Sequence, residues 1–589
     1  MRKTKIVCTI GPASEDKAKL KSMIEAGMNV ARLNFSHGSH EEHLQRIINL
    51  KDLRREMGVP LAIMLDTRGP EIRIGKFEDG QVTLMPGSRF ILTTRDIEGG
   101  VEGVSVNYQR LPEILKQGDR ILLDDGLIEL EVISSRGEDV ECEILHGGTL
   151  SNHKSLNLPG IPVEMPYLSD RDKSDILFAI EHELDFIALS FVRTAQDVLD
   201  VKRFLAKNQN NGIELIAKIE NRSGIEHIDE IIRLTAGIMV ARGDMGVEIP
   251  FEELPHLQKK LIKKSYTAGK RVITATQMLE SMVRNPRPTR AEITDVANAI
   301  YDGTSAIMLS GETASGKYPI EAIKTMVKIA EKTEQSIDYK AESMQTDAAP
   351  DHSIINAISH ATCTTARDLE AVAIVTLTKT GSTARMISRY RPATNIIAVT
   401  PVERTYHQLA LSWGVTPLMN EYRETSRELF QDAANKTKES GLAKDGDIIV
   451  ITGSSDQVGE ITNTLQIHVL GNILLKGRGN GLEQVRGRVH VSSETDDTLR
   501  KFREGDILVV DKTTNEVLKV VKTALGVITE EDMAASGVAA ACIAMGIPVI
   551  ASAYGAAERL KTGFSVVMDT EKGIVYNSNI CASPPCLEE

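Results

Sequence analysis

An apolar run followed by a polar loop and an amphipathic helical pattern recurs eight times within the first 340 residues. The apolar runs are rich in β-branched residues, and such runs are typical of parallel strands that are buried on both faces. Eight strand–helix units predict a closed (β/α)8 barrel, in which the chemistry lies at the C-terminal ends of the strands. The eight predicted strands are 5–10, 28–33, 61–66, 185–190, 213–216, 237–240, 271–276 and 305–310.

The regular spacing is interrupted once, between Asp66 and Asp185. Within this interval, 70–166 changes to alternating strands and turns, and 121–130 has the pattern of a β-hairpin with Asp-Gly at its turn. We therefore predict that 70–166 is an all-β domain inserted after the third barrel strand, where it stands over the barrel mouth as a lid. The catalytic barrel then comprises 1–69 and 167–340.

The pattern weakens after about residue 340, where a polar connection precedes a second α/β domain predicted at 350–472. Its sheet is expected to be mostly parallel, and a glycine-rich stretch at 476–481 is predicted to be a flexible linker. The last segment, 480–589, is predicted to be a small domain of mixed strands and helices. The strand candidates of the second α/β domain are 372–377, 396–399, 447–451 and 465–469.

Length, charge and cysteine pattern narrow the class of protein. A chain of 589 residues is too long for one hydrophobic core. Its net charge of −13 argues against a general nucleic-acid binder, which needs a basic face. No apolar stretch has the length of a membrane span and the N-terminus has no signal-peptide pattern, so we expect a cytoplasmic protein. The six cysteines are scattered and are expected to be reduced, and a metal or disulfide role is the alternative for Cys581 and Cys586.

Two predicted strands end in charged groups that a protein core tolerates only when they have partners. Lys218 and Glu220 close one strand, and Asp244 follows the next strand in an Arg-Gly-Asp turn. The two carboxylates offer hard oxygens to a divalent cation, and the lysine supplies a positive charge close to them in the sequence. This combination is suited to holding a phosphorylated anion, and we therefore predict an enzyme.

Six motifs at strand ends together resemble the pyruvate kinase family. They lie at 31–38, 65–73, 218–221, 242–244, 273–279 and 308–313. The resemblance covers 1 to about 470 in the same order, and the final segment resembles the extra C-terminal domain of some bacterial members. It implies a glycolytic enzyme that transfers the phosphoryl group of phosphoenolpyruvate to ADP, with pyruvate and ATP as products. It also implies a homotetramer that is regulated by a phosphorylated metabolite.

The resemblance assigns catalytic and substrate-binding residues position by position. Glu220 and Asp244 would hold Mg²⁺ or Mn²⁺, which stabilises negative charge on the enolate and on the phosphoryl group. Lys218 would neutralise charge on the phosphoryl group in transit. The other implied residues are Arg32 and Arg73 around the phosphoryl group, Thr276 on the face where the enolate is protonated, and the backbone of Gly243 and Asp244 at the substrate carboxylate.

On the ADP side, the resemblance implies contacts with Asn34, His37 and Arg73, and with Lys154 from the lid. Two of these residues have a second interpretation. Lys154 is also compatible with a solvated surface lysine, since His153 stands beside it where the family usually has a second lysine. His37 is also compatible with a capping or core histidine.

The resemblance also implies a K⁺ ion held by the oxygens of Asn34, Ser36, Asp66 and Thr67. Glu71 strengthens this prediction, because family members that work without K⁺ have a lysine at this position. A lysine ammonium can take the place of the ion, whereas the Glu71 carboxylate cannot. We therefore predict that the enzyme requires K⁺.

A loop in the second α/β domain resembles the phosphate pocket for allosteric effectors in the family. It follows a predicted strand, opens a helix and combines small hydroxyl side chains with glycine and helix N–H groups, which suits a phosphate. The effector would be a sugar phosphate or a nucleoside monophosphate, and the alternative interpretation is a plain helix N-cap. The loop comprises Thr378, Lys379, Thr380, Gly381, Ser382 and Thr383.

The C-terminal segment resembles, over 529–550, the phosphohistidine domain of phosphoenolpyruvate-utilising enzymes. Those enzymes have a histidine where this chain has Gly537. Without an imidazole there is no nucleophile to carry a phosphoryl group. We therefore expect this domain to be structural or regulatory and to contribute to subunit contacts, without a catalytic role.

Two other functions are compatible with parts of this pattern. One is a catalytically silent relative that serves as an effector-binding regulatory subunit, although the intact set of Arg32, Lys218, Glu220, Asp244 and Thr276 favours an active enzyme. The other is a different barrel enzyme, such as an aldolase that forms a Schiff base on Lys218. Neighbouring carboxylates and Mg²⁺ would keep Lys218 protonated, which disfavours imine chemistry.

Overall fold

The structure is a computed structural model that describes residues 2–161, 163–210, 212–339, 353–423, 425–454, 462–471, 473–492 and 501–577. The chain forms two compact units. The first comprises Met1–Ser359 and Thr378–Glu421, and the second comprises His360–Leu377 and Tyr422–Glu589.

Eight parallel strands of the first unit close into a barrel in the order β1-β16-β15-β14-β13-β12-β3-β2. The predicted (β/α)8 barrel is thereby confirmed, and each strand overlaps its predicted run. The strands are β1 (Lys5–Thr9), β2 (Val30–Asn34), β3 (Ala62–Asp66), β12 (Phe186–Leu189), β13 (Glu214–Ile219), β14 (Gly237–Ala241), β15 (Arg271–Ala275) and β16 (Ala306–Leu309).

Alternate residues of these strands build two apolar layers. Val7, Met64 and Met239 belong to a cluster that fills the barrel, whereas Ile6 and Cys8 belong to the cluster between strands and helices. Both layers are needed, because a strand in a parallel sheet buries both of its faces. Since the interior of the barrel is packed with apolar side chains, polar groups collect at its rim.

The helices around the barrel begin at side-chain caps that the sequence supplies. Ser39 and Glu42 form a capping box at one helix, and Thr289 and Glu292 form one at another. The elements are α1 (Lys17–Ala26), α2 (His40–Met57), α4 (Asp170–Glu181), α5 (Ala195–Lys207), α6 (Arg222–Glu226), α7 (Ile228–Leu234), α8 (Arg242–Glu248), α9 (Leu254–Thr267), η1 (Glu280–Val283), α10 (Arg290–Tyr301), α11 (Gly311–Ala314) and α12 (Pro319–Ser336).

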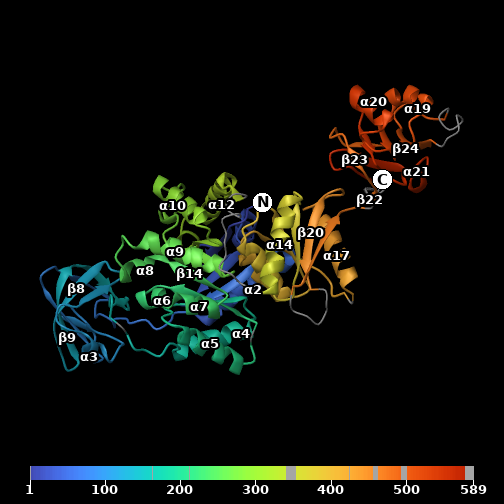
Figure 1. The fold of residues 1–589 in the computed structure, drawn as a ribbon. Helices are drawn as coiled ribbons and strands as arrows, with labels where there is room; N and C mark the ends of the chain where they lie inside the picture. The colour runs from blue at the N-terminus through green and yellow to red at the C-terminus, as the bar shows by residue number, and fades with distance from the viewer. Residues whose placement is uncertain are drawn as a thin grey trace, which may run out of the picture. The chain divides into compact units, whose positions relative to one another are not determined.

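The segment inserted after β3 is built from strands, as predicted, and also contains one short helix that was not predicted (blue in Figure 1). It contains a six-stranded sheet in the order β11-β7-β8-β9-β5-β6 and a two-stranded sheet of β10 and β4. The predicted hairpin is present, since β7 and β8 pair antiparallel with Leu123 opposite Ile128. The elements are β4 (Gln81–Leu84), β5 (Arg89–Thr93), β6 (Gly103–Ser105), α3 (Leu111–Ile114), β7 (Arg120–Leu123), β8 (Ile128–Arg136), β9 (Asp139–His146), β10 (Gly148–Ser151) and β11 (Leu156–Asn157).

The first unit also contains a parallel pair of strands, β18 (Asn395–Thr400) and β19 (Val415–Met419). β19 was not predicted, because Pro417 and an alternation of buried and partly exposed residues break the apolar pattern. Ala410 and Leu411 pack against the cluster that fills the barrel. The helical elements of this stretch are α15 (Ser382–Arg389), α16 (Glu403–Gln408) and η2 (Leu409–Leu411). The helix α14 (Ile354–Asp368) begins in the first unit and ends in the second.

In the second unit, β17 (Ala373–Leu377) pairs in parallel with β20 (Ile448–Gly453), and β20 pairs antiparallel with β21 (Thr464–Val469). The helix α17 (Ser426–Glu439) precedes β20 in the sequence. With β18 of the first unit, all four strands predicted for the second α/β domain are present.

The C-terminal part of the second unit contains an eight-stranded mixed sheet in the order β22-β29-β28-β24-β25-β26-β27-β23. The prediction of a flexible linker at 476–481 was wrong, because β22 and β23 of this sheet lie there. The elements are β22 (Ile473–Lys476), β23 (Arg478–Gly479), β24 (Val485–Ser492), β25 (Ile507–Val510), α19 (Asn515–Val520), η3 (Val521–Thr523), β26 (Gly526–Thr529), α20 (Gly537–Met545), β27 (Val549–Ala551), α21 (Ala556–Arg559), β28 (Ser565–Asp569) and β29 (Ile574–Asn577).

In the part of the chain that the structure describes, no helix is both long and apolar enough to cross a membrane. The thiols of Cys8, Cys142 and Cys542 are free, as expected for reduced cysteines. Cys581 and Cys586, which were also expected to be reduced, lie outside the described residues.

Candidate active site

A buried cluster of charged side chains lies at the C-terminal rim of the barrel. Lys218 on β13 is its centre, with Nζ 2.9 Å from Glu220 Oε1 and 3.2 Å from Asp66 Oδ1. Lys218 Nζ also donates a hydrogen bond of 2.7 Å to Ser190 Oγ. Three oxygen atoms therefore surround the ammonium, one of them through a hydrogen bond and two through ion pairs. Since Glu220 and Asp66 are both 0% exposed, water screens these charges weakly.

Asp66 joins this lysine to a second cation. The Arg32 guanidinium donates from Nε to Asp66 Oδ2 over 2.6 Å and from Nη1 to Thr9 Oγ1 over 2.9 Å. Burial alone would raise the pKa of Asp66, but Arg32 and Lys218 outweigh it and hold that pKa below its ordinary value. Asp66 is therefore an ionised carboxylate that fixes the positions of both cations.

The Lys218 ammonium stays charged in this environment. Burial would lower its pKa, but the carboxylates of Asp66 and Glu220 raise that pKa above the ordinary value of lysine. A lysine must lose its proton before it attacks a carbonyl group, so this environment argues against the Schiff-base alternative. A fixed positive charge suits an anionic phosphoryl group instead.

Glu220 presents one carboxylate oxygen that has no hydrogen bond. Its Oε2 accepts the Phe191 N–H at 2.5 Å, whereas its buried Oε1 faces only the Lys218 ammonium, outside hydrogen-bond geometry. Burial and then the negative charge of Asp244 raise the pKa of Glu220, against the effect of Lys218. Two carboxylates that repel each other in a buried site are stabilised by a divalent cation between them.

Another buried carboxylate near the barrel rim accepts hydrogen bonds from backbone N–H groups. Glu312, on α11, is 0% exposed, and its two oxygens accept the N–H groups of Leu279 at 3.0 Å and Ser310 at 2.7 Å. Glu312 therefore holds the loops after β15 and β16 together. Both oxygens of Glu312 are used by the backbone, whereas Glu220 keeps one oxygen available to a metal ion.

Thr276 is hydrogen-bonded to the turn that contains Asp244. Gly243, in the first turn of α8, donates its N–H to Thr276 Oγ1 at 2.8 Å, and Thr276 Oγ1 donates to the Ala275 carbonyl at 2.7 Å. Thr276 and Gln277 both have positive φ angles, of 66° and 53°. Such a backbone is strained and persists only when its surroundings fix it.

The Arg242 guanidinium provides that restraint. It donates to the carbonyl of Thr276 at 2.7 Å and to that of Gln277 at 3.3 Å, and it pairs with Asp295 at 2.7 Å. The sequence analysis saw Arg242 only as part of a motif and gave it no role. Three bonds from one buried side chain keep the Thr276 hydroxyl facing the Gly243 turn.

The residues expected to hold K⁺ lie along the adjacent strands β2 and β3 and just after them. Asn34 is the register partner of Asp66, and its Oδ1 accepts the Ser36 N–H at 3.2 Å. Thr67 accepts two bonds from Ser190, the O–H on its carbonyl oxygen at 2.6 Å and the N–H on its Oγ1 at 3.2 Å. The fold therefore brings this oxygen-rich set to one side of the charged cluster.

Arg73 lies at the start of the inserted domain and is held by Glu71. Its Nε donates to Glu71 Oε2 at 2.7 Å, and its Nη1 donates to the His153 carbonyl at 2.5 Å. Burial lowers the pKa of His37, and the positive charges of Arg73 and Arg32 lower it further. His37 is therefore a neutral imidazole in a positively charged neighbourhood, as an anion-binding site requires.

The structure does not bring Lys154 to the rim of the barrel. Its ammonium pairs with Asp124 at 2.6 Å, within the inserted domain. Its side chain is 39% exposed. This geometry is compatible with both interpretations of Lys154, the surface lysine and the nucleotide contact.

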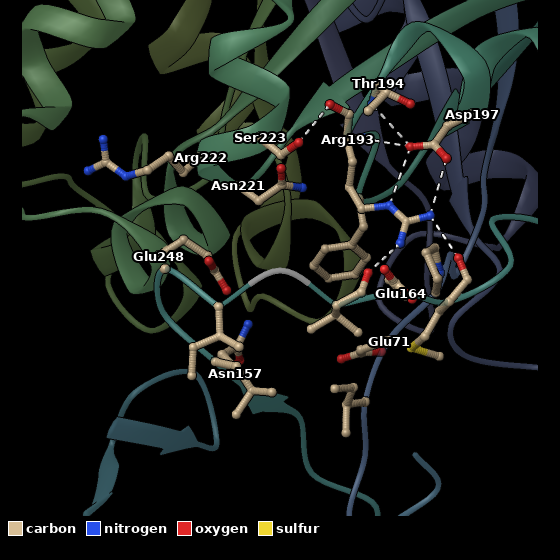
Figure 2. A pocket seen from close by; sticks show the side chains of 18 of the residues that line it. Glu71, Asn157, Glu164, Arg193, Thr194, Asp197, Asn221, Arg222, Ser223 and Glu248 are labelled. Atoms are coloured by element: carbon tan, nitrogen blue, oxygen red, sulfur yellow. Dashed lines mark hydrogen bonds and ion pairs between the residues drawn. The ribbon is translucent and has the colours of Figure 1, made fainter. Parts of the chain in front are cut away.

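A cavity of about 860 Å³ lies beside the charged cluster, where the inserted domain joins the barrel (Figure 2). Its lining includes Glu71 from one connecting segment, Glu164 from the other and Asn221 from the barrel. Arg193 fixes the second connecting segment, since its guanidinium donates to the Val163 and Met165 carbonyls, both at 2.9 Å. The orientation of the inserted domain is thus coupled to the loop that follows β12.

The candidate effector loop runs from Thr378 into α15. Gly381 caps this helix with a φ of 76° and donates its N–H to Thr378 Oγ1 at 2.9 Å. Thr380 Oγ1 donates to Ser382 Oγ at 3.1 Å, so two hydroxyl groups lie together at the helix start. Arg385 donates to the Thr380 carbonyl at 2.9 Å, which adds a positive charge at the same place.

The position of the missing histidine in the C-terminal segment is sterically closed. Gly537 is the first residue of α20, and a Cβ there would lie 2.9 Å from Thr513 Cγ2. Thr513 is itself fixed, because its hydroxyl donates to Glu531 at 2.5 Å and accepts the Val538 N–H at 3.0 Å. No side chain fits at this position unless Thr513 moves.

Comparison with known proteins decides the family. A model of the pyruvate kinase barrel domain matches 1–323, and a model of the pyruvate kinase alpha/beta domain matches 356–468. The pyruvate kinase of Geobacillus stearothermophilus is 46% identical over 582 residues, which cover 98% of this chain and 99% of that protein. The chain belongs to the pyruvate kinase family.

Further proteins similar to this chain are also pyruvate kinases. The pyruvate kinase of Staphylococcus aureus (strain MRSA252) is 45% identical over 580 residues, 98% of this chain and 99% of its own. A crystal structure of a pyruvate kinase from Cryptosporidium parvum superposes with a TM-score of 0.76 at 38% identity, over 80% of this chain and 96% of that one. A model of the mobile domain of PEP-utilising enzymes matches 502–573.

As a pyruvate kinase, the enzyme transfers the phosphoryl group of phosphoenolpyruvate to ADP in glycolysis. Pyruvate kinases in general use a divalent metal ion and K⁺, and their substrates are phosphoenolpyruvate and ADP. Membership therefore excludes the aldolase alternative. It also agrees with the prediction of an active enzyme over a silent relative, since the match extends over the full length of both chains.

Proposed function

We propose that the charged cluster around Lys218 is the site of phosphoryl transfer. The contact of Lys218 with Asp66 and Glu220 carries this proposal, because it fixes an ammonium beside a carboxylate that is available to a metal ion. The Lys218 ammonium neutralises charge on the phosphoryl group as it passes from phosphoenolpyruvate to ADP. Arg32 and Arg73 contribute guanidinium donors to the same group.

Glu220 and Asp244 are proposed to hold the divalent ion, Mg²⁺ or Mn²⁺. Oε1 of Glu220, which accepts no hydrogen bond and faces the Lys218 ammonium, fits this role, and so does the burial of Glu220 next to the charge of Asp244. Among the described residues no group of three or more His, Cys, Asp or Glu side chains is arranged to hold a metal. An ion held by two protein carboxylates keeps open positions for substrate oxygens, and when bound it stabilises negative charge on them.

Thr276 and the Gly243 turn are proposed to bind the remainder of phosphoenolpyruvate. The backbone of Gly243 and Asp244 lies in the first turn of α8, where N–H groups suit the substrate carboxylate. A threonine hydroxyl is a weak acid, so we assign Thr276 to positioning the enolate and to passing a proton through water. Its bonds to Gly243 and Ala275 support a fixed orientation.

The nucleotide is proposed to contact Asn34, His37 and Arg73, with Lys154 reaching it from the inserted domain. The positive charges of the arginines near His37 support these contacts, and the geometry of Lys154 is compatible with its part in them. We further propose that the inserted domain, 70–166, acts as a lid that excludes water from the transfer. The barrel would comprise 1–69 and 167–340, the effector domain 350–472 and the C-terminal domain 480–589.

A K⁺ ion is proposed at Asn34, Ser36, Asp66 and Thr67, and the enzyme is predicted to require it. Without K⁺ and Na⁺, and with Mg²⁺ saturating, we expect pyruvate formation to slow at least ~100-fold, because a positive charge beside the transferring group is missing. Choline chloride would keep the ionic strength constant in a coupled pyruvate assay.

Glu71→Lys is the matched variant for this prediction. The ammonium of the introduced lysine can supply the positive charge of the absent K⁺, so the variant should work without that ion. Full activity of the unmodified enzyme in the K⁺-free buffer would contradict the requirement.

The loop Thr378–Thr383 is proposed to bind the phosphate of an allosteric effector. Its paired hydroxyl groups and Arg385 support this, and Arg385 also lies 3.4 Å from Glu214, the first residue of the strand that carries Lys218. Glu214 therefore offers a physical connection from the loop to the site.

Alanine at both Thr380 and Ser382 is expected to weaken activation by a phosphorylated effector. In a titration with ribose 5-phosphate, glucose 6-phosphate and AMP, the effective concentration of the activating compound should rise at least ~10-fold, because charge-assisted bonds are lost. Activity without effector should be unchanged. Alanine at Thr425 and Ser426, which open α17, is the matched control and should leave activation intact. Equal activation of the loop variant and the parent would refute the assignment.

The C-terminal domain is proposed to be structural or regulatory, to contribute to subunit contacts, and not to carry a phosphoryl group. The closed position at Gly537 supports the absence of a phosphohistidine. By resemblance to the family, we also propose a homotetramer located in the cytoplasm, where glycolysis takes place.

A further inference from the structure

Ser190 stands between the proposed K⁺ ligands and the lysine that handles the phosphoryl group. It directly follows β12, which pairs with β3 on one side and with β13 on the other. Ala188 of β12 is the register partner of Asp66, and Leu189 is the partner of Ala217. The next residue is therefore flanked by the end of β3 and by Lys218.

The Ser190 hydroxyl contacts both neighbours. Its Oγ accepts a hydrogen bond from Lys218 Nζ at 2.7 Å and lies 2.6 Å from the Thr67 carbonyl and 3.1 Å from Asp66 Oδ1. A hydroxyl group has one proton, so it donates to one of these acceptors while its lone pairs face the ammonium. The residue is 2% exposed, and water does not compete for these bonds.

Lys218 forms ion pairs with two carboxylates, whereas Ser190 is a neutral hydrogen-bond acceptor for the same ammonium. A neutral acceptor orients an ammonium without adding negative charge next to the phosphoryl group. The direction of the Ser190 hydroxyl depends in turn on its two possible acceptors, the Thr67 carbonyl and the Asp66 carboxylate. A cation bound to those oxygens fixes their positions, and through them the direction of the Ser190 hydroxyl.

We propose that Ser190 is the positioning residue through which the monovalent cation controls Lys218. This inference rests on the proposed function, because it takes the K⁺ site and the role of Lys218 from it. Ser190 touches neither substrate nor the phosphoryl group in this account. Its role is to make the orientation of the ammonium depend on occupancy of the cation site.

The test is a titration of kcat and of KM for phosphoenolpyruvate against K⁺ in four proteins. They are the parent enzyme, Ser190→Ala, Ser190→Thr and the control Ser265→Ala. Ser265 is also buried, but its hydroxyl donates only to the Leu261 carbonyl within α9. Thermal unfolding of each protein reports whether the variant is folded.

Ser190→Ala should lower kcat at saturating K⁺ by about 10- to 100-fold, because a bond to a charged group is lost. Its rate without K⁺ should fall much less than its rate with K⁺, so the activation ratio decreases. The affinity for Tl⁺, a spectroscopic substitute for K⁺, should change less than about threefold, since the cation keeps its own ligands. Ser190→Thr retains the hydroxyl and should restore most of the activation, and Ser265→Ala should match the parent.

Two results would overturn the proposal. Ser190→Ala with the activation ratio of the parent would show that the hydroxyl does not couple the two sites. A large loss of Tl⁺ affinity in this variant would show that Ser190 builds the cation site and does not relay its effect. Failure of the proposed function itself is recognised separately, because the parent enzyme would then be fully active without K⁺ before any variant is made.

Discussion

Replacement of Lys218 by methionine is expected to lower kcat by at least ~10³-fold while the protein remains folded. Methionine keeps the length of the side chain but removes the ammonium that contacts both Asp66 and Glu220. The phosphoryl group then passes the site without its neutralising charge. KM for phosphoenolpyruvate should change much less, because Arg32 and the metal ion still bind the substrate.

Lys5→Met is the matched control for this variant. Lys5 is also a buried lysine of a barrel strand, but its ammonium donates to the Val415 carbonyl. Its loss should change thermal stability and leave kcat of the folded enzyme close to that of the parent. Steady-state kinetics with a coupled pyruvate assay, together with thermal unfolding, separate the two effects. A Lys218→Met enzyme with kcat within tenfold of the parent would remove Lys218 from the mechanism.

Glu220→Gln is expected to abolish the divalent metal site. The change keeps the size of the side chain and the bond to the Phe191 N–H can persist, but one of two proposed ligand carboxylates becomes a neutral amide. We expect the affinity for Mn²⁺, measured by electron paramagnetic resonance, to fall at least ~100-fold, which exceeds the usual effect of outer-shell changes. Activity at physiological Mg²⁺ should fall at least ~10³-fold.

Glu312→Gln provides the comparison, since Glu312 is equally buried but binds backbone N–H groups. It should lower thermal stability and leave Mn²⁺ affinity near the parent value. If Glu220→Gln kept its Mn²⁺ affinity, or if both variants lost it equally, Glu220 would not be a metal ligand.

Much of the fold could be predicted because its signals are local in the sequence. Each barrel strand is a short apolar run, and the runs recur with regular spacing. Lys218 and Glu220 were identifiable because charges at the end of a buried strand need partners. The segment at 476–481 misled the prediction, since glycine also permits close packing: a Cβ on Gly479 would lie 1.8 Å from the Thr570 carbonyl oxygen.

The parts that the sequence did not reveal depend on barrel closure. A serine after a strand is common and carries no signal of its own. Ser190 gains its role only because β12 lies between β3 and β13, which are distant in the sequence. Arg242 is similar: it stood in a recognised motif, but its bonds to the Thr276 and Gln277 carbonyls follow from the pairing of β14 with β15.

A crystal of the enzyme grown with Mn²⁺ and oxalate would test the central claim most directly. Oxalate imitates the enolate of pyruvate, and the anomalous scattering of Mn²⁺ locates the ion without ambiguity. The account predicts one Mn²⁺ coordinated by the carboxylates of Glu220 and Asp244 and by oxalate, with Lys218 Nζ next to the oxalate. Mn²⁺ and oxalate bound together at any other position on the chain would contradict it.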